Sequence, residues 1–168
     1  MKIADFMPMA DWLAFQAEID TRFNTGTVVY DAEGMQATPH DCKRNPLCQA
    51  IRSFPDGQTQ ICARAQQAMA AMTRRTHEAA IEECDAGMVK LVVPVFSDDE
   101  FLGTSGVCGF LRHDEEVDAF YVGKVTGISE AEIATLAKGV RRVSSGEVEA
   151  IAEFMAGSIE ETARQLAP

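Results

Sequence analysis

The chain lacks the excess of positive charge that nucleic-acid binding requires. Its 168 residues include 15 Lys and Arg against 26 Asp and Glu, which gives a formal net charge of −11 and a sequence pI near 4.6. A protein that binds a phosphate backbone normally presents a basic face, because counterion release drives the association. We therefore expect no nucleic acid among its partners.

Long hydrophobic runs are also missing. No stretch approaches the roughly 20 apolar residues of a membrane-spanning helix. The first 20 residues, MKIADFMPMADWLAFQAEID, contain an acid within ten positions and no apolar run of signal-peptide length. These absences predict a cytoplasmic protein with no membrane partner.

Close cysteine pairs are absent, although the chain has five cysteines. Cys42, Cys48, Cys62 and Cys84 are separated by 5, 13 and 21 residues, unlike the C-x2-C pairs of zinc ribbons. In a reducing compartment an odd number of cysteines argues against a disulfide framework. Three interpretations remain: a zinc or iron–sulfur site with these four thiolates as ligands, a redox-switching thiol pair, or inert burial. Cys108, in the middle of an expected strand, is interpreted as merely buried.

Histidines are few and scattered. His40, His77 and His113 lie in unrelated segments, and none stands beside a group that it would activate. Isolated histidines at such positions are more often surface residues than general bases. We therefore expect a protein that is not an enzyme. The alternatives are a thiol-dependent redox enzyme that acts through Cys62, or a small-ligand-binding interaction module whose cysteines are inert.

The remaining pattern predicts one domain of the α+β class. A hydrophobic content of 46% and a mean hydropathy of −0.08 are ordinary for a globular protein. Alternation and β-branched residues predict strands over 27–31, 88–96 and 101–112, whereas residues 58–78 have strong helix propensity. Residues 113–168 are expected to add helices. This order favours an antiparallel sheet flanked by helices.

Two expected helices carry apolar stripes. One stripe consists of residues 12, 15, 19 and 23, and the other of residues 148, 151, 155 and 159. Pairing of such stripes between two copies would give a homodimer. The alternative is that both stripes pack on the sheet or on each other within one copy.

Glycines in the expected strand 101–112 leave space beside it. Gly103 and Gly106 would leave room for a small ligand, with Tyr30, Phe96 and Phe110 as walls of the pocket. The alternative is that the glycines form a bulge or bend and the aromatic rings fill the core.

Two segments resemble the sensory domain named after the PocR regulator. They are LCQAIRSFPDGQTQICARAQQAM and ECDAGMVKLVVPVFSDDEFLGTSGVCGF, within a resemblance over about residues 10–112. The matching features are a cysteine before a short helix, a cysteine opening a longer helix, a Cys-x-Ala-Gly start to an apolar strand that ends in Pro, and a Leu-Gly on the return strand. They fall at Cys48, Cys62, Cys84 with Ala86 and Gly87, Pro94, and Leu102 with Gly103.

The resemblance implies a PAS-like fold and a role as a small-molecule or redox sensor in bacterial signalling. Two features depart from the family pattern: Asp85 stands where a histidine usually follows the last cysteine, and Cys42 adds a fourth cysteine to the usual three. The DNA-binding or kinase module that usually accompanies such domains is not seen. We therefore expect output through another signalling protein, or through the helices after residue 112.

Overall fold

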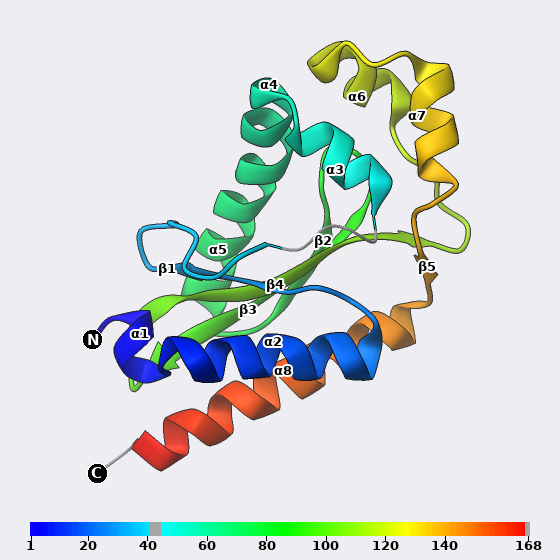
Figure 1. The fold of residues 1–168 in the computed structure, drawn as a ribbon. Helices are drawn as coiled ribbons and strands as arrows, with labels where there is room; N and C mark the ends of the chain where they lie inside the picture. Colours follow the sequence, from blue (N-terminus) through cyan, green and yellow to red (C-terminus); the bar gives the residue numbers. More distant parts are fainter. Residues whose placement is uncertain (41–44, 167–168) are drawn as a thin grey trace.

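The computed structural model describes residues 1–40 and 45–166, and it shows a sheet covered by helices on both faces (Figure 1). Four strands form an antiparallel sheet in the order β1-β4-β3-β2. The expected α+β architecture, with an antiparallel sheet containing residues 27–31, 88–96 and 101–112, is confirmed. The strands are β1 (Val28–Asp31), β2 (Ala80–Glu83), β3 (Val89–Ser97), β4 (Glu100–Arg112) and β5 (Arg142–Val143).

Two strands were not expected from the sequence. β2 pairs with the free edge of β3, with Ala80 opposite Val92. β5 is only two residues long and runs parallel to the end of β4, where Leu111 lies opposite Arg142. β5 is too short for alternation to reveal it, and β2, with the sequence AIEE, has only one β-branched residue.

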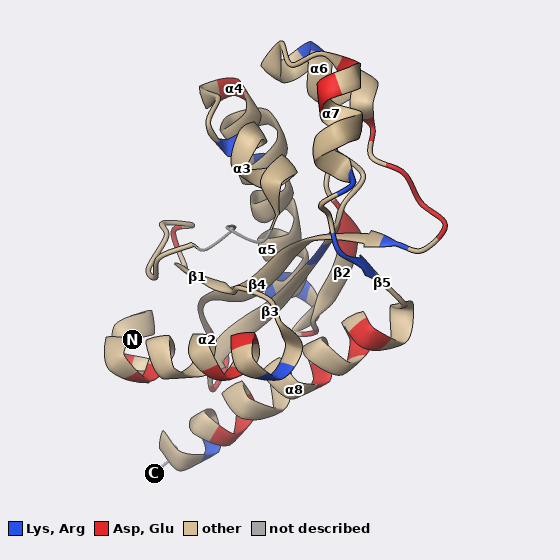
Figure 2. Ribbon diagram, turned by 45° about the vertical axis from the view of Figure 1, so that its right-hand side comes forward, with Lys and Arg blue, Asp and Glu red and all other residues tan. Residues whose placement is uncertain are grey.

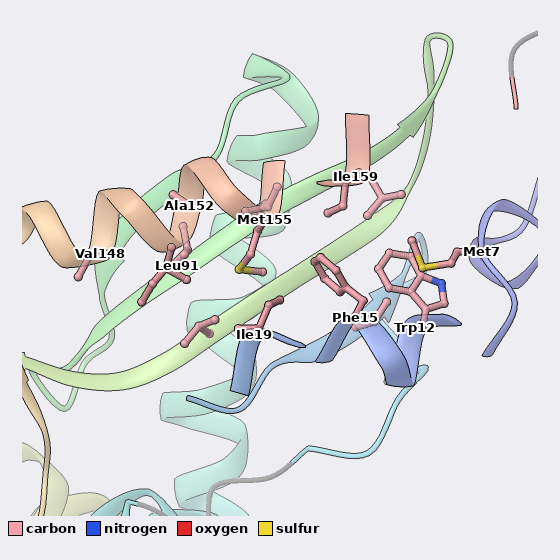
Figure 3. Packing of buried hydrophobic residues seen from close by; sticks show 14 of the residues in the cluster. Met7, Trp12, Phe15, Ile19, Leu91, Val148, Ala152, Met155 and Ile159 are labelled. Carbon is pink, nitrogen blue, oxygen red and sulfur yellow. The ribbon is translucent and has the colours of Figure 1, made fainter. Parts of the chain in front are cut away.

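One face of the sheet is covered by two long helices whose apolar stripes form the main core (Figure 3). These helices are α2 (Met9–Phe23) and α8 (Ser145–Leu166), and the short helix α1 (Ile3–Phe6) closes one end. Trp12, Ile19 and Met155 are fully buried there. Both predicted stripes therefore pack on the sheet within one copy, which was the alternative to pairing between two copies. Homodimer formation stays a prediction.

The opposite face carries the helices α3 (Pro46–Arg52), α4 (Pro55–Gly57) and α5 (Arg64–Thr76) (Figure 1). A π-helical segment, η1 (Gln58–Ala63), precedes α5, so the predicted helix over 58–78 is present but begins with a wider turn. A β-carbon at Gly57 would lie 2.2 Å from the carbonyl oxygen of Ile51. Glycine at this position thus lets α3 approach η1 closely.

Positive backbone dihedrals at two glycines accompany irregularities in the pairing of β4 with β3. The register shifts between Val95 and Phe96 and again between Val89 and Lys90. Gly103, with φ +146°, lies at the first shift, and Gly109, with φ +93°, lies at the second. A β-carbon at Gly103 would be 2.0 Å from the carbonyl oxygen of Tyr30 in β1. The space beside Gly103 is therefore taken by the neighbouring backbone.

The residues after β4 form two short helices and return to the sheet. Asp118 and Ser129 cap their N-termini by accepting hydrogen bonds from backbone amides. Their buried residues pack with Leu47, Ile51 and Leu111 in a second apolar cluster. Within 1–40 and 45–166, no helix combines the length and apolar character needed to cross a membrane. The two helices are α6 (Ala119–Thr126) and α7 (Glu130–Ala137).

Candidate functional site

A small cavity lies between the sheet and the helices α3, η1 and α5, and we call it the inner cavity. Its volume is about 40 Å³. Four of the five cysteines line it, and each comes from a different segment of the chain. They are Cys48 in α3, Cys62 in η1, Cys84 after β2, and Cys108 in β4. Residues far apart in sequence thus bring four thiols to one place.

The side chain of Asn45 fixes Cys48 against the sheet. Its Oδ1 accepts a hydrogen bond from the Cys48 amide at 2.9 Å and so caps α3. Its Nδ2 donates to the carbonyl oxygen of Gly109 at 2.8 Å. The Sγ of Cys48 then lies 3.9 Å from the Sδ of Met88. One capping residue therefore joins the start of α3 to β4 beside the cavity.

Cys62 occupies the π-helical segment and is partly buried. Burial raises the pKa of its thiol to about 11, and the charges of Cys108 and Cys84 act in the same direction. The positive charges of Arg52 and Lys90 oppose this rise. At neutral pH Cys62 is therefore a protonated thiol in the absence of a ligand.

Cys84 sits in a tight turn that leads into β3. The Cys84 amide donates to the Met88 carbonyl at 2.9 Å, and Gly87, with φ +85°, donates back to the Cys84 carbonyl at 2.8 Å. Burial raises the pKa of the thiol, whereas backbone hydrogen bonds from Met88 and Ala86 lower it. The turn thus aims two backbone amide donors at the Cys84 sulfur, which favours its thiolate form against the effect of burial.

Cys108 belongs to this site, although the sequence indicated only burial. Its Sγ lies 3.8 Å from Nε2 of His40. Its charge would raise the pKa of Cys62, Cys84 and the Tyr30 hydroxyl. For Tyr30, burial is the largest cause of the raised pKa. Cys108 is therefore the neighbour that these three groups share.

The predicted set of metal ligands is brought together in part. Cys48, Cys62 and Cys84 all line the inner cavity. Cys42 lies outside the residues that the structure describes. Within the described residues, no group of three or more His, Cys, Asp and Glu side chains is arranged as a metal site.

The predicted aromatic pocket is distributed over three different depressions. Tyr30 lines the inner cavity, Phe96 lies near the end of α8, and Phe110 lies beside Arg141. Phe96 is stacked on His77 with ring centroids 4.1 Å apart. Phe110 also belongs to the core beneath α2 and α8. The three rings thus do not wall one pocket.

The two glycines of that prediction face backbone atoms of neighbouring strands. A β-carbon at Gly106 would lie 3.0 Å from the carbonyl oxygen of Leu91, while Gly103 faces β1 as described above. Neither glycine lines the inner cavity. The bulge interpretation therefore accounts for Gly103 better than the space for a ligand does.

A larger groove of about 450 Å³ lies next to the inner cavity, and we call it the outer groove. The turn 31–36 forms one wall, and η1 with α5 forms the other. Tyr30, Arg52 and Cys62 line both spaces. Gln66 also lines the groove, and its buried Oε1 has no hydrogen-bond partner while Nε2 donates to Thr104 at 2.9 Å. The groove is thus an open approach to the thiols, with an unpaired amide oxygen in its wall.

The sequence over residues 5–165 matches the family model of the sensory domain found in PocR. The chain belongs to the PocR sensory-domain family. The match extends well beyond residue 112, so α6, α7 and α8 belong to the domain as the family defines it. Comparisons with curated proteins and with solved structures found no match. Membership indicates a sensory role in signal transduction, and a sensory family is not expected to be catalytic.

Proposed function

We propose that this domain is a signalling sensor that binds a small ligand in the inner cavity. The observation that carries the proposal is the convergence of four thiols on one space between the sheet and three helical segments. A water molecule needs roughly 10–15 Å³ by this kind of measure, so about 40 Å³ holds a ligand of about three or four non-hydrogen atoms. Arg52 and Tyr30, at the junction with the outer groove, stand at the entrance.

The response is a shift of η1 and α5. π-Helical turns are rare and occur mostly at functional sites, and η1 carries Cys62 on the cavity wall. A ligand that displaces Cys62 acts directly on η1, because the π-helical turn and an α-helical turn differ in the direction of this side chain. The change then passes along α5 to β3, against which α5 packs. A downstream signalling protein is the proposed receiver.

Filling the cavity tests this proposal. Ala65 lines the inner cavity, so the Ala65→Leu variant should occupy it, whereas Ala131→Leu on the exposed side of α7 is the matched control. The wild type and both variants are screened by thermal shift against compounds of up to about six non-hydrogen atoms. We expect a stabilising compound for the wild type and control, and none for Ala65→Leu. Equal stabilisation of all three proteins would place the ligand elsewhere.

A cysteine-ligated metal centre is a second candidate, and the chemistry of the cavity supports it. Thiolate sulfur is the ligand that zinc and iron–sulfur clusters prefer. Cys48, Cys62 and Cys84, with Cys42 or Cys108 as a fourth donor, are the residues that would hold such a centre. The amide hydrogen bonds at Cys84 favour a thiolate there. The centre would supply a redox- or metal-dependent signal.

Metal and sulfide analysis of protein purified without oxygen tests the second candidate. Each of the five cysteines is replaced by alanine in turn, and bound metal is measured in each variant. We expect the variants that lack Cys48, Cys62 or Cys84 to lose the metal. Of the Cys42 and Cys108 variants, the one that lacks the fourth ligand should also lose it, and the other should keep its full metal content. A metal-free wild type whose thiols oxidise reversibly would exclude the centre and favour a redox switch.

A further inference from the structure

The inner cavity is cationic in a protein that is otherwise strongly acidic. Figure 2 shows Asp and Glu along α2 and α8 and in the loop before α6. The cavity lining contains Lys90 and Arg52 but no Asp or Glu among the residues that the structure describes. The charge of this site is thus opposite in sign to the net charge of −11.

Lys90 is the unusual member of this pair. It lies inside β3 between Val89 and Leu91, and only 5% of its surface is exposed. Its charge lowers the pKa of both Cys62 and Cys84, so the ammonium group lies near these thiols.

No carboxylate neutralises this lysine within residues 1–40 and 45–166. Glu82 is its opposite neighbour in β2, but its side chain is exposed and no ion pair joins the two. An ammonium group at the end of a largely buried side chain is costly without a counter-charge, unless a ligand or a hydrogen-bond acceptor compensates it. Among the described residues no group supplies this charge, and an anion bound in the cavity would supply it.

We propose that the inner cavity binds a planar oxyanion of about three or four non-hydrogen atoms, held between Lys90 and Arg52. A short carboxylate such as acetate has this size and charge. A guanidinium group binds a carboxylate with two parallel hydrogen bonds, and an ammonium group adds a point charge. Ile51, Ile61 and Met88 provide an apolar wall for a methyl group. This inference rests on the proposed sensor site and names the class of its ligand.

A comparison of acetate with acetamide shows whether the cavity selects its ligand by charge or by shape. The two have the same number of non-hydrogen atoms, but only acetate is charged. Thermal shift is measured with each compound at constant ionic strength. We expect acetate to stabilise the protein and acetamide to have at least about tenfold weaker affinity, equivalent to about 1.4 kcal/mol. Equal affinities would overturn the proposed charge selection. Nitrate and bicarbonate, tested in parallel, show whether the anion is a carboxylate or an inorganic oxyanion.

Lys90→Met removes the charge while keeping the length of the side chain. Lys138→Met, at an exposed position, is the control, and circular dichroism checks that each variant folds. We expect Lys90→Met to lose acetate stabilisation at least about tenfold and the control to keep it. Lys90→Arg keeps the positive charge and should keep acetate binding. It therefore provides the test if Lys90→Met does not fold. Unchanged acetate affinity in a folded Lys90→Met protein would contradict the proposal.

Mass spectrometry of thiol modification distinguishes the failure of this inference from the failure of the sensor site. Methyl methanethiolsulfonate, a small neutral reagent that reacts with thiolates, is applied at a fixed pH of about 9, and bound acetate should slow its labelling of Cys62 and Cys108. If a neutral compound protects the thiols and acetate does not, the cavity is the sensor site but the anion inference is wrong. If acetate stabilises the protein without protecting the thiols, it binds outside the cavity and the anion inference fails. The sensor site itself fails only if no stabilising compound protects the thiols.

Discussion

The two faces of one sheet differ sharply in composition. On the face beneath α2 and α8, alternate residues of β3 are apolar and pack into a continuous core. On the face beneath α5, the intervening residues of the two central strands include Lys90, Thr104 and Cys108. Both faces are largely covered, but only the second contains cavities with thiols and charges. The core on the first face supplies most of the stability of the fold. The second face can therefore contain a cavity for a ligand without a large loss of stability.

Truncation of a core residue on the α2–α8 face should have the largest effect. Leu91 is 1% exposed in the middle of β3. Leu91→Ala removes buried methyl groups and leaves a cavity, so we expect the free energy of unfolding to fall by about 3 kcal/mol. Urea unfolding followed by circular dichroism measures it.

The matched truncation on the other face is Cys108→Ala. The side chain is small and already borders a cavity, so we expect a loss below about 1 kcal/mol. A loss as large as that of Leu91→Ala would show that the two faces contribute equally to stability. The contrast between the faces would then be one of composition only.

Gly103→Ala should have the next largest effect. The new β-carbon would meet the Tyr30 carbonyl oxygen at 2.0 Å, and the φ of +146° is unfavourable for alanine. We expect a destabilisation of about 2–3 kcal/mol, measured by urea unfolding. Gly34→Ala is the control, because its φ is +81° but no atom lies within 4 Å of the new carbon. It should cost about 1 kcal/mol.

A further test uses the raised thiol pKa on the cavity face. Burial raises the pKa of Cys62 from 9.0 to about 11 in the folded protein. The unfolded chain therefore loses this proton first, and the stability that is fully present below pH 9 is lost as pH rises through 11. We expect the ligand-free wild type to lose about 2 kcal/mol more than Cys62→Ala between pH 9 and 11. Parallel pH curves for the two proteins would show that the thiol is not desolvated.

The sequence predicted the elements that carry long periodic patterns. The stripe from Trp12 to Phe23 and the runs on either side of the hairpin turn are repeated often enough to be recognised. The four residues of β2 and the two of β5 show no recognisable pattern, because their pairing depends on neighbours distant in sequence. The π-helical turn likewise has no propensity signature, although the helix that it opens was predicted.

The candidate site was predicted less completely than the fold. Cys48, Cys62 and Cys84 were identified by their places at element ends, but Cys108 was set aside because a strand interior suggested burial alone. The sequence did contain one signal of a polar site on this face, because Lys90 is the single charged residue in the apolar run MVKLVVPVF. That Lys90 and Cys108 share one face of paired strands follows from register, which only the fold provides.

Glu82→Gln should give the smallest effect and tests where the charge of Lys90 is neutralised. Glu82 lies opposite Lys90 across β2 and β3, and its side chain is exposed, so solvent screens its charge from the ammonium. If an oxyanion in the inner cavity is the counter-charge, removing Glu82 should tighten acetate binding by about twofold or less. Isothermal titration of acetate measures this, with Glu78→Gln, exposed near the far end of the sheet, as the control. A tightening of acetate binding well above twofold, or a stability loss above about 1 kcal/mol, would instead make Glu82 the partner of Lys90 and leave the cavity without an unbalanced charge.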